Sequence, residues 1–119
     1  MSIGSEGGRR GERAAARHLR RRGWTVVTTR WRAAGGELDL VAARGGVLAL
    51  CEVKARSDPA ALVEPVTAAQ RVRIRRAAEA FLVSRPDLAG LAPRLDLITV
   101  RLGSVRARVS HHPGVVGDP

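Results

Sequence analysis

The chain has 119 residues, enough for one packed domain but not for two. Hydrophobic residues make up 45% of it, which excludes disorder by composition, and its single cysteine, Cys51, excludes a disulfide framework. The net charge of +10 favours nucleic acid as a partner, with an anionic membrane surface second. No apolar run approaches the roughly 20 residues of a spanning helix, so the expectation is a cytoplasmic protein with no membrane partner.

The first half of the chain predicts one helix and three strands. Residues 1–8 are glycine-rich and expected to be flexible. Alanines and Leu19 at helical spacing predict a helix over Arg9–Arg22, which Gly23 ends. Three strands follow, separated by glycine pairs that are typical of turns: Trp24–Trp31, Glu37–Ala43 and Val47–Ala55.

The second half predicts one helix and two more strands. After a proline-containing loop, Thr67 is the expected N-cap of a helix that runs to about Ser84 and is stopped by Pro86. The next strands are Arg94–Leu102 and Val105–Ser110, and residues 111–119 form a tail expected to be loose. The sequence therefore predicts an α/β domain over residues 9–110, with a mixed sheet of four to five strands flanked by two helices.

Charged side chains interrupt the apolar pattern of two neighbouring strands. Alternation places Glu52 and Lys54 on the face that the leucines of the third strand occupy. In the second strand, Glu37 and Asp39 share one face, and the apolar residues hold mainly to the other: Leu38, Leu40 and Ala42. Because carboxylate and ammonium groups are almost never buried without partners, Asp39, Glu52 and Lys54 are expected to meet at one place.

Lys54 is the only lysine in the chain, and the other 20 basic residues are arginine. Arginine is a wide, permanently charged fork, whereas lysine is a compact ammonium that can point at one oxygen atom. A lone lysine therefore suggests a position that arginine cannot serve. The alternative, an arginine-rich composition that left one lysine by accident, stays open on this observation alone.

Both helices direct a polar residue toward the same region. Glu12 precedes Ala15 and Leu19 at helical spacing, and Gln70 precedes Ile74 by four residues, so both lie on the inner faces of their helices. Two or three carboxylates with open coordination positions suit a hard cation such as Mg²⁺, with Mn²⁺ as a substitute. A lysine beside such an ion can position the attacking water.

Four segments resemble the YraN family of small bacterial proteins, which is assigned to the PD-(D/E)XK nuclease superfamily and is similar to archaeal Holliday-junction resolvases. The segments are Gly11-Glu12 with Ala15, Gly36–Leu40, Cys51–Arg56 and Arg94–Asp96. The similarity runs from about Gly8 to Val100. It implies a restriction-endonuclease-like core, three layers in the order α-β-α.

The resemblance also implies roles for individual residues. Asp39 and Glu52 would be metal ligands, and Lys54 would position the water. Glu12 would be an additional acid and metal ligand from the helix, and Glu37 an accessory acid. The role of Gln70 stays open, because many relatives carry lysine there.

The implied activity is a metal-dependent endonuclease acting on structured or branched DNA. DNA is expected rather than RNA, and cutting two strands would need two sites, as in a homodimer. Arginines near the site are expected to contact phosphates, although they also fit a solvated surface: Arg32, Arg56, Arg71, Arg73, Arg75 and Arg76. The alternative is a non-catalytic nucleic-acid-binding module with the same fold. A weaker alternative is a basic assembly protein that binds RNA.

Individual residues have structural interpretations as well. Glu52 and Lys54 could form a simple ion pair, and Glu12 could only stabilise the start of a helix. Gln70 could be a first-turn residue without a role in the site. Asp96 is expected to pair structurally with Arg94 or with a neighbouring backbone group. Three further expectations concern Trp24 and Trp31 as core or dimer contacts, Cys51 as an inert buried thiol, and His111 and His112 as weak metal candidates.

Overall fold

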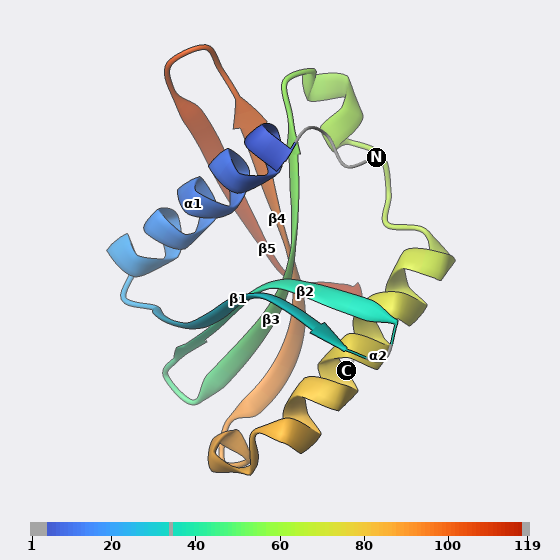
Figure 1. The fold of residues 1–119 in the computed structure, drawn as a ribbon. Coiled ribbons are helices and arrows are strands. Elements are labelled where there is room, and N and C mark those ends of the chain that lie inside the picture. Colours follow the sequence, from blue (N-terminus) through green and yellow to red (C-terminus); the bar gives the residue numbers. More distant parts are fainter. Residues whose placement is uncertain (1–4, 34, 118–119) are drawn as a thin grey trace.

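One helix covers each face of a five-stranded sheet (Figure 1). The computed structural model describes residues 5–33 and 35–117, with side chains from residue 8 onward. The helices are α1 (Ser5–Arg21) and α2 (Ala68–Ser84), with short 3₁₀ turns η1 (Pro59–Leu62) and η2 (Pro86–Leu88). The strands are β1 (Thr25–Ala33), β2 (Gly36–Arg44), β3 (Val47–Arg56), β4 (Ala92–Leu102) and β5 (Ala107–Gly117).

The strands lie in chain order, from β1 at one edge to β5 at the other. Neighbouring strands are antiparallel except β3 and β4, which run parallel because α2 connects them across one face of the sheet. The predicted mixed sheet between two helices is therefore confirmed.

Each helix has its own apolar layer against the sheet. Ala15 and Leu19 of α1 pack on Leu40 and Cys51. On the opposite face, Phe81 of α2 belongs to a cluster that contains the leucines of β3 and one face of β4. The predicted alternation of β3 is confirmed, because its leucines face α2 whereas its cysteine and alanines face α1.

Two glycines let the helices approach the strands that carry the candidate site. A Cβ at Gly11 in α1 would overlap the Cβ of Ala55 in β3. A Cβ at Gly36, where β2 begins, would overlap the carbonyl oxygen of Arg73 in α2. Any side chain at either position would push a helix away from the sheet.

The structure differs from the predicted ends of the chain. α1 begins at Ser5, so the part of the predicted flexible segment that the structure describes is helical. β5 extends to Gly117, so residues 111–117, expected to be loose, form a paired strand. Residues 1–4 and 118–119, for which flexibility was also predicted, lie outside the described residues. Within the described residues, neither helix combines the length and apolarity needed to cross a bilayer.

Candidate functional site

The pairing between β2 and β3 ends at Leu40 and Cys51. One residue earlier in β2, the side chain of Asp39 replaces backbone pairing with β3. Its Oδ2 accepts a hydrogen bond of 2.7 Å from the backbone N–H of Val53. Leu38 then packs on the α2 side of the sheet, whereas Leu40 packs on the α1 side. The prediction that Leu38 shares a face with Leu40 is therefore wrong, because β2 loses its regular alternation at Asp39.

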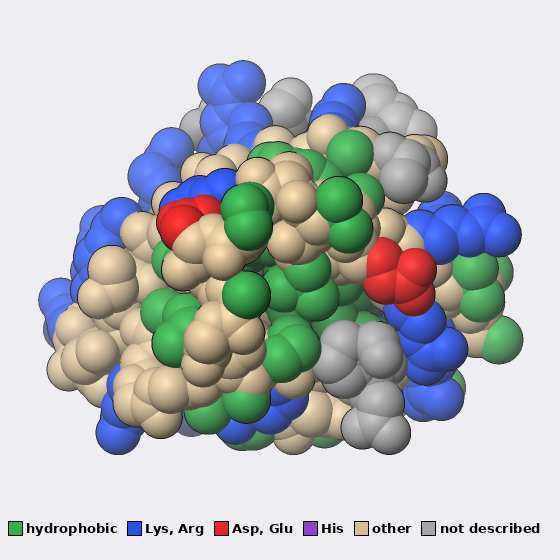
Figure 2. All heavy atoms as spheres, turned by 90° about the horizontal axis from the view of Figure 1, so that it is seen from below, with side chains coloured by type: hydrophobic (Ala, Val, Ile, Leu, Met, Phe, Trp, Pro, Cys, Tyr) green, Lys and Arg blue, Asp and Glu red, His purple; other side chains and the backbone are tan. Residues whose placement is uncertain are grey.

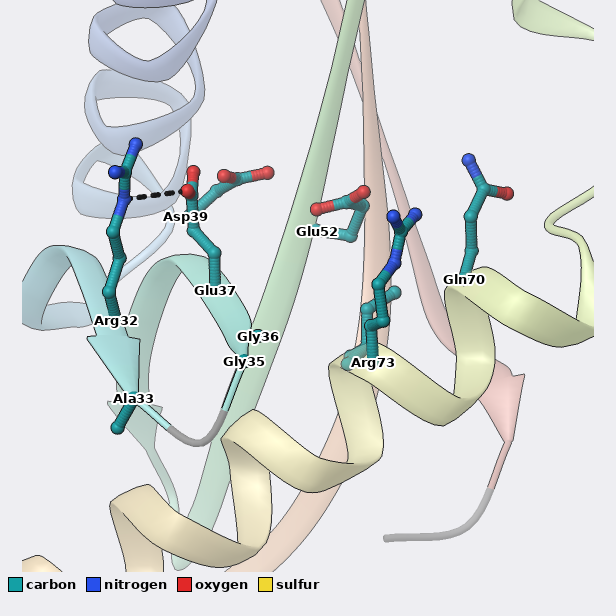
Figure 3. A pocket seen from close by; sticks show the side chains of 10 residues that line it. Arg32, Ala33, Gly35, Gly36, Glu37, Asp39, Glu52, Gln70 and Arg73 are labelled. Atoms are coloured by element: carbon teal, nitrogen blue, oxygen red, sulfur yellow. Dashed lines mark ion pairs between the residues drawn. The ribbon is translucent and has the colours of Figure 1, made fainter.

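A cavity of about 670 Å³ lies between the β1–β2 turn, β3 and α2. Its polar lining comes from each of these elements (Figure 3): Arg32, Glu37, Asp39, Glu52, Gln70 and Arg73. The structure thus brings together Asp39, Glu52, Glu37 and Gln70 of the predicted catalytic residues.

The carboxylates of Asp39 and Glu52 face each other across this cavity (Figure 3). Burial is the largest cause that raises the pKa of Asp39 above its ordinary value, and the neighbouring carboxylate of Glu52 is the next. The N–H of Val53 opposes this effect without cancelling it, and Glu37 adds to it. Two carboxylates held this close favour a proton or a cation between them.

Glu37 and Gln70 line the cavity and also have structural partners. Glu37 forms an ion pair of 2.9 Å with Arg32 across the β1–β2 hairpin. Gln70 completes a capping box at the start of α2, since its Oε1 accepts the N–H of Thr67 at 2.8 Å. The cap explains why Gln70 stands in the first turn. The Thr-x-x-Gln spacing in the sequence is the signal that could have identified it.

Lys54 lies on the same face of β3 as Glu52, but it lines a second, small cavity beside the first. Its Nζ donates a hydrogen bond of 3.0 Å to the carbonyl oxygen of Glu64. Glu52 and Gln70 line both cavities, whereas Lys54 lines only the small one and Asp39 only the large one. A direct ion pair between Glu52 and Lys54 is absent from the described residues.

Glu12 is the predicted acid that the structure leaves outside the cavity. Its side chain is only 16% exposed, and it forms an ion pair of 2.5 Å with Arg30 of β1. It lines a different groove, between α1 and β1. Its placement on the covered face of α1 agrees with the helical spacing, but its convergence with Asp39 and Glu52 does not occur in this structure.

Arg30 lies near the site in a backbone conformation, and with an ion-pair partner, that the sequence did not predict. Its φ is +53°, a left-handed conformation that is uncommon for residues other than glycine. In the register of β1 with β2 it stands opposite Asp39, and both are missing from the ladder. Its ion pair with Glu12 is the main cause that raises the pKa of Arg30, and Glu37 and Asp39 contribute through their charges. Arg30 therefore lies between Glu12 and the cavity acids. No pattern in the sequence predicts its left-handed backbone conformation.

The arginines predicted to contact phosphates fall into two groups. Arg32 and Arg73 line the large cavity, and Arg56 lines the small one beside Lys54. The remaining three are exposed on α2: Arg71, Arg75 and Arg76. On the face in Figure 2, basic side chains lie around the rim and acidic ones are few.

Hydrogen bonds within the sheet involve Asp96 and His111, and apolar packing surrounds Cys51. Asp96 is fully buried, and it accepts hydrogen bonds from Arg94 at 2.8 and 3.0 Å and from Gly114 N–H at 2.8 Å. Its Oδ2 lies 2.7 Å from His111 Nε2, so Asp96 joins β4 to β5. Burial favours a raised pKa, but the bonds from His111, Arg94 and Gly114 outweigh it and hold the pKa of Asp96 below its ordinary value. Cys51 faces α1, and burial raises the pKa of its thiol.

The other aromatic and histidine predictions can be placed as well. Trp31 packs edge-on against Phe81, with ring centroids 5.3 Å apart, which confirms a core contact. Trp24 borders the α1 core, with the guanidinium groups of Arg44 and Arg94 each 5.9 Å from its ring centroid. His112 hydrogen-bonds Thr99 at 3.0 Å.

The described residues contain no group of three or more Asp, Glu, His or Cys side chains arranged to hold a metal ion. The available acids are therefore the pair Asp39 and Glu52, with Glu37 adjacent. Two carboxylates fit the needs of Mg²⁺, which usually takes one or two from the protein and completes its shell with water and phosphate oxygens. The fold and the site together thus define an α/β domain with paired acids in a cavity that two arginines also line.

The chain belongs to the uncharacterised protein family UPF0102, whose model matches residues 11–100. Similar members are UPF0102 proteins of Dinoroseobacter shibae, 45% identical over 82% of this chain and 72% of that protein, and of Roseiflexus castenholzii, 41% identical over 91% and 90%. A Parafrankia member is 39% identical over 96% of this chain and 98% of its own length. The matched range contains Asp39, Glu52 and Lys54.

Proposed function

We propose that this protein is a metal-dependent endonuclease that hydrolyses phosphodiester bonds, with structured or branched DNA as its substrate. The observation that carries the proposal is the pair of carboxylates, Asp39 and Glu52, which neighbouring strands direct into one cavity that Arg32 and Arg73 also line. The resemblance of the family to the PD-(D/E)XK nucleases, with their restriction-endonuclease-like core, agrees with the α-β-α layers.

Asp39 and Glu52 would hold the metal ion, Mg²⁺ or in its place Mn²⁺. Burial, and next the repulsion from Glu52, raise the pKa of Asp39, so the cavity is electrostatically unsatisfied without a proton or a cation. When bound, the ion would acidify a water molecule and neutralise charge on a phosphoryl oxygen. Glu12 is not included in this ligand set, because it pairs with Arg30.

The remaining polar residues would bind and orient the substrate. Lys54 follows Glu52 on the same face of β3, and its ammonium can orient the attacking water or hold the negative charge that develops on phosphate. Arg32 and Arg73, on opposite walls of the cavity, can hold phosphate oxygens in a bidentate manner. Contacts of this kind favour the backbone and shape of a nucleic acid over its sequence.

A second candidate function, a non-catalytic nucleic-acid-binding module, has observations in its favour. Lys54 contacts the carbonyl of Glu64 and Glu12 pairs with Arg30, so neither is directed at the carboxylate pair. A protein that binds nucleic acid without cutting it would need the arginines but not the paired acids.

Cleavage assays with defined variants distinguish the two functions. The purified protein is incubated with branched, linear and single-stranded DNA and with RNA, in Mg²⁺, Mn²⁺ or EDTA. We expect metal-dependent cutting by the wild type, strongest on branched DNA, and binding without cutting by Glu52→Gln and Lys54→Ala. Glu79→Gln is the matched control, because Glu79 is an exposed acid of α2 outside both cavities.

The proposal is contradicted if no substrate is cut in any metal while all variants bind as the wild type does. That outcome supports the binding module. Cutting that persists in Glu52→Gln would instead place the active centre elsewhere.

A further inference from the structure

α1 carries a row of exposed arginines that faces a groove between α1 and β1. Arg9, Arg13, Arg17 and Arg21 are spaced four residues apart, so they follow one another along the same side of the helix. The groove has a volume of about 640 Å³, and Arg20 and Arg30 also line it. Over the 12 residues from first to last, the row spans about 18 Å.

The groove has a large excess of positive charge. Among the residues whose side chains the structure describes, one acid lines it, Glu12, and that acid is already paired with Arg30. Among the side chains that the structure describes, none of the arginines in the row forms an ion pair. Like charges four residues apart destabilise a helix, so the row opposes the stability of α1 instead of supporting it.

The row has no function in packing α1. The helix is held to the sheet by its other face, through Ala15 and Leu19, which are buried. A mixture of positive and negative side chains would keep a surface hydrated equally well. Repeated unpaired arginines match an anionic partner with a regular spacing of charges, and nucleic acid places one phosphate per 3.4 Å of each strand, so roughly five fit along 18 Å.

We propose that the arginine row of α1 (Arg9, Arg13, Arg17 and Arg21) binds the phosphate backbone of the nucleic acid, as a second contact surface on the α1 side of the sheet. Guanidinium groups bind phosphate oxygens in a bidentate manner, which suits arginine over lysine here. The inference rests on the proposed function only for the identity of the ligand.

The row is connected to the candidate site through β1. Arg30 lines the α1 groove, pairs with Glu12 there, and stands opposite Asp39 in the strand register. A strand of nucleic acid lying in the groove would therefore pass Arg30 on its way to the cavity that holds Asp39 and Glu52.

The test measures binding of a 20-base-pair DNA duplex by fluorescence anisotropy, in EDTA and at several salt concentrations. Because EDTA prevents metal-dependent cutting, the result does not depend on whether the protein is a nuclease. The double variant Arg13→Gln/Arg17→Gln is compared with Arg101→Gln/Arg108→Gln. The second pair removes the same charge from exposed, register-paired positions on β4 and β5, at the far edge of the sheet.

We expect the α1 variant to bind about tenfold or more weakly near 0.1 M salt, with a slope of log K against log salt smaller by about 1.8, or about 0.9 for each lost phosphate contact. The control variant should change both quantities much less. Circular dichroism should show both variants folded, since Arg13→Gln/Arg17→Gln relieves repulsion within α1.

Equal losses in the two variants would overturn the inference, because net charge alone would then explain binding. Unchanged binding of the α1 variant would overturn it as well. So would loss of binding to anionic phospholipid vesicles with unchanged binding to DNA, because that result assigns the row to a membrane surface.

Discussion

Replacing Asp39 by Asn should stabilise the metal-free protein, and the gain should grow with pH. Asn keeps the oxygen that accepts the N–H of Val53, but it removes a carboxylate that is buried and faces Glu52. The pKa of Asp39 is raised in the fold, so the protonated acid is the form that the fold accommodates. Its contribution to stability is complete below the unfolded pKa of about 3.9 and is lost as pH rises toward the folded pKa.

The expected size follows from this linkage. While Asp39 is protonated in the folded protein and ionised in the unfolded chain, each pH unit costs the wild type about 1.4 kcal/mol relative to Asp39→Asn. Between pH 4 and pH 6 the difference in unfolding free energy should reach about 3 kcal/mol. Comparing two proteins that differ at one residue cancels the titration of groups that do not interact with Asp39.

Urea unfolding of both proteins from pH 4 to pH 8, in EDTA and in Mg²⁺, measures this difference. Mg²⁺ should stabilise the wild type but not Asp39→Asn. Asp87→Asn is the matched control. Arg85 donates hydrogen bonds to Asp87 and lowers its pKa, so that substitution should give a smaller difference of the opposite sign. A pH-independent difference, or a wild type more stable than Asp39→Asn at pH 8 in EDTA, would refute the reasoning.

Three further predictions concern the structure around the site. Gln70→Ala should lower the unfolding free energy measured in urea by about 1 kcal/mol, because it removes half of the capping box with Thr67. Gln70→Glu should retain most of the stability. Equal stability of the wild type and both variants would contradict a stabilising role of the capping box. Arg94→Ala should lower the unfolding free energy by about 2–3 kcal/mol at pH 7, because it leaves the buried carboxylate of Asp96 short of a partner. The loss should be smaller at pH 3, because the pKa of Asp96 is lowered in the fold and the stability that its carboxylate contributes disappears as pH falls. Urea unfolding at both pH values checks the sign. Cys51 should resist iodoacetamide in the native protein at pH 8 and react on unfolding, because burial raises the pKa of its thiol; rapid native alkylation would place the thiol at the surface.

The sequence predicted the fold well where the apolar pattern was regular. Leu48 and Leu50 alternate with Ala49 and Cys51, and the structure distributes them to opposite faces of β3. Such a pattern requires that both faces of the strand be covered, whereas the α-β-α order of the layers was implied by the family resemblance. The N-cap at Thr67 was equally visible, because a side-chain oxygen must satisfy the first free N–H groups of a helix.

The prediction failed where a side chain replaced backbone pairing. Asp39 occupies the hydrogen-bonding position on Val53 that a regular ladder would give to the backbone, and this turns Leu38 to the other face. Similarly, β5 continues through residues with a proline and a glycine because Asp96 holds His111 and Gly114. Both hydrogen-bonding arrangements join residues that are distant in the chain. The local periodicity of the sequence gives no information about such contacts.

The candidate site was predicted in part. Alternation alone placed Asp39 and Glu52 near each other, because neighbouring strands have a fixed register. Helical spacing placed Glu12 on the covered side of α1, but it could not reveal that Arg30, in a left-handed conformation, would pair with it. A periodic pattern gives the face of a helix and not the partner across it.

The binding of Mn²⁺ followed by electron paramagnetic resonance tests most directly whether Asp39 and Glu52 together hold a divalent cation. We expect saturable binding by the wild type and by Glu79→Gln, and affinity at least tenfold lower in Asp39→Asn and in Glu52→Gln. Equal affinity in all four proteins would contradict it.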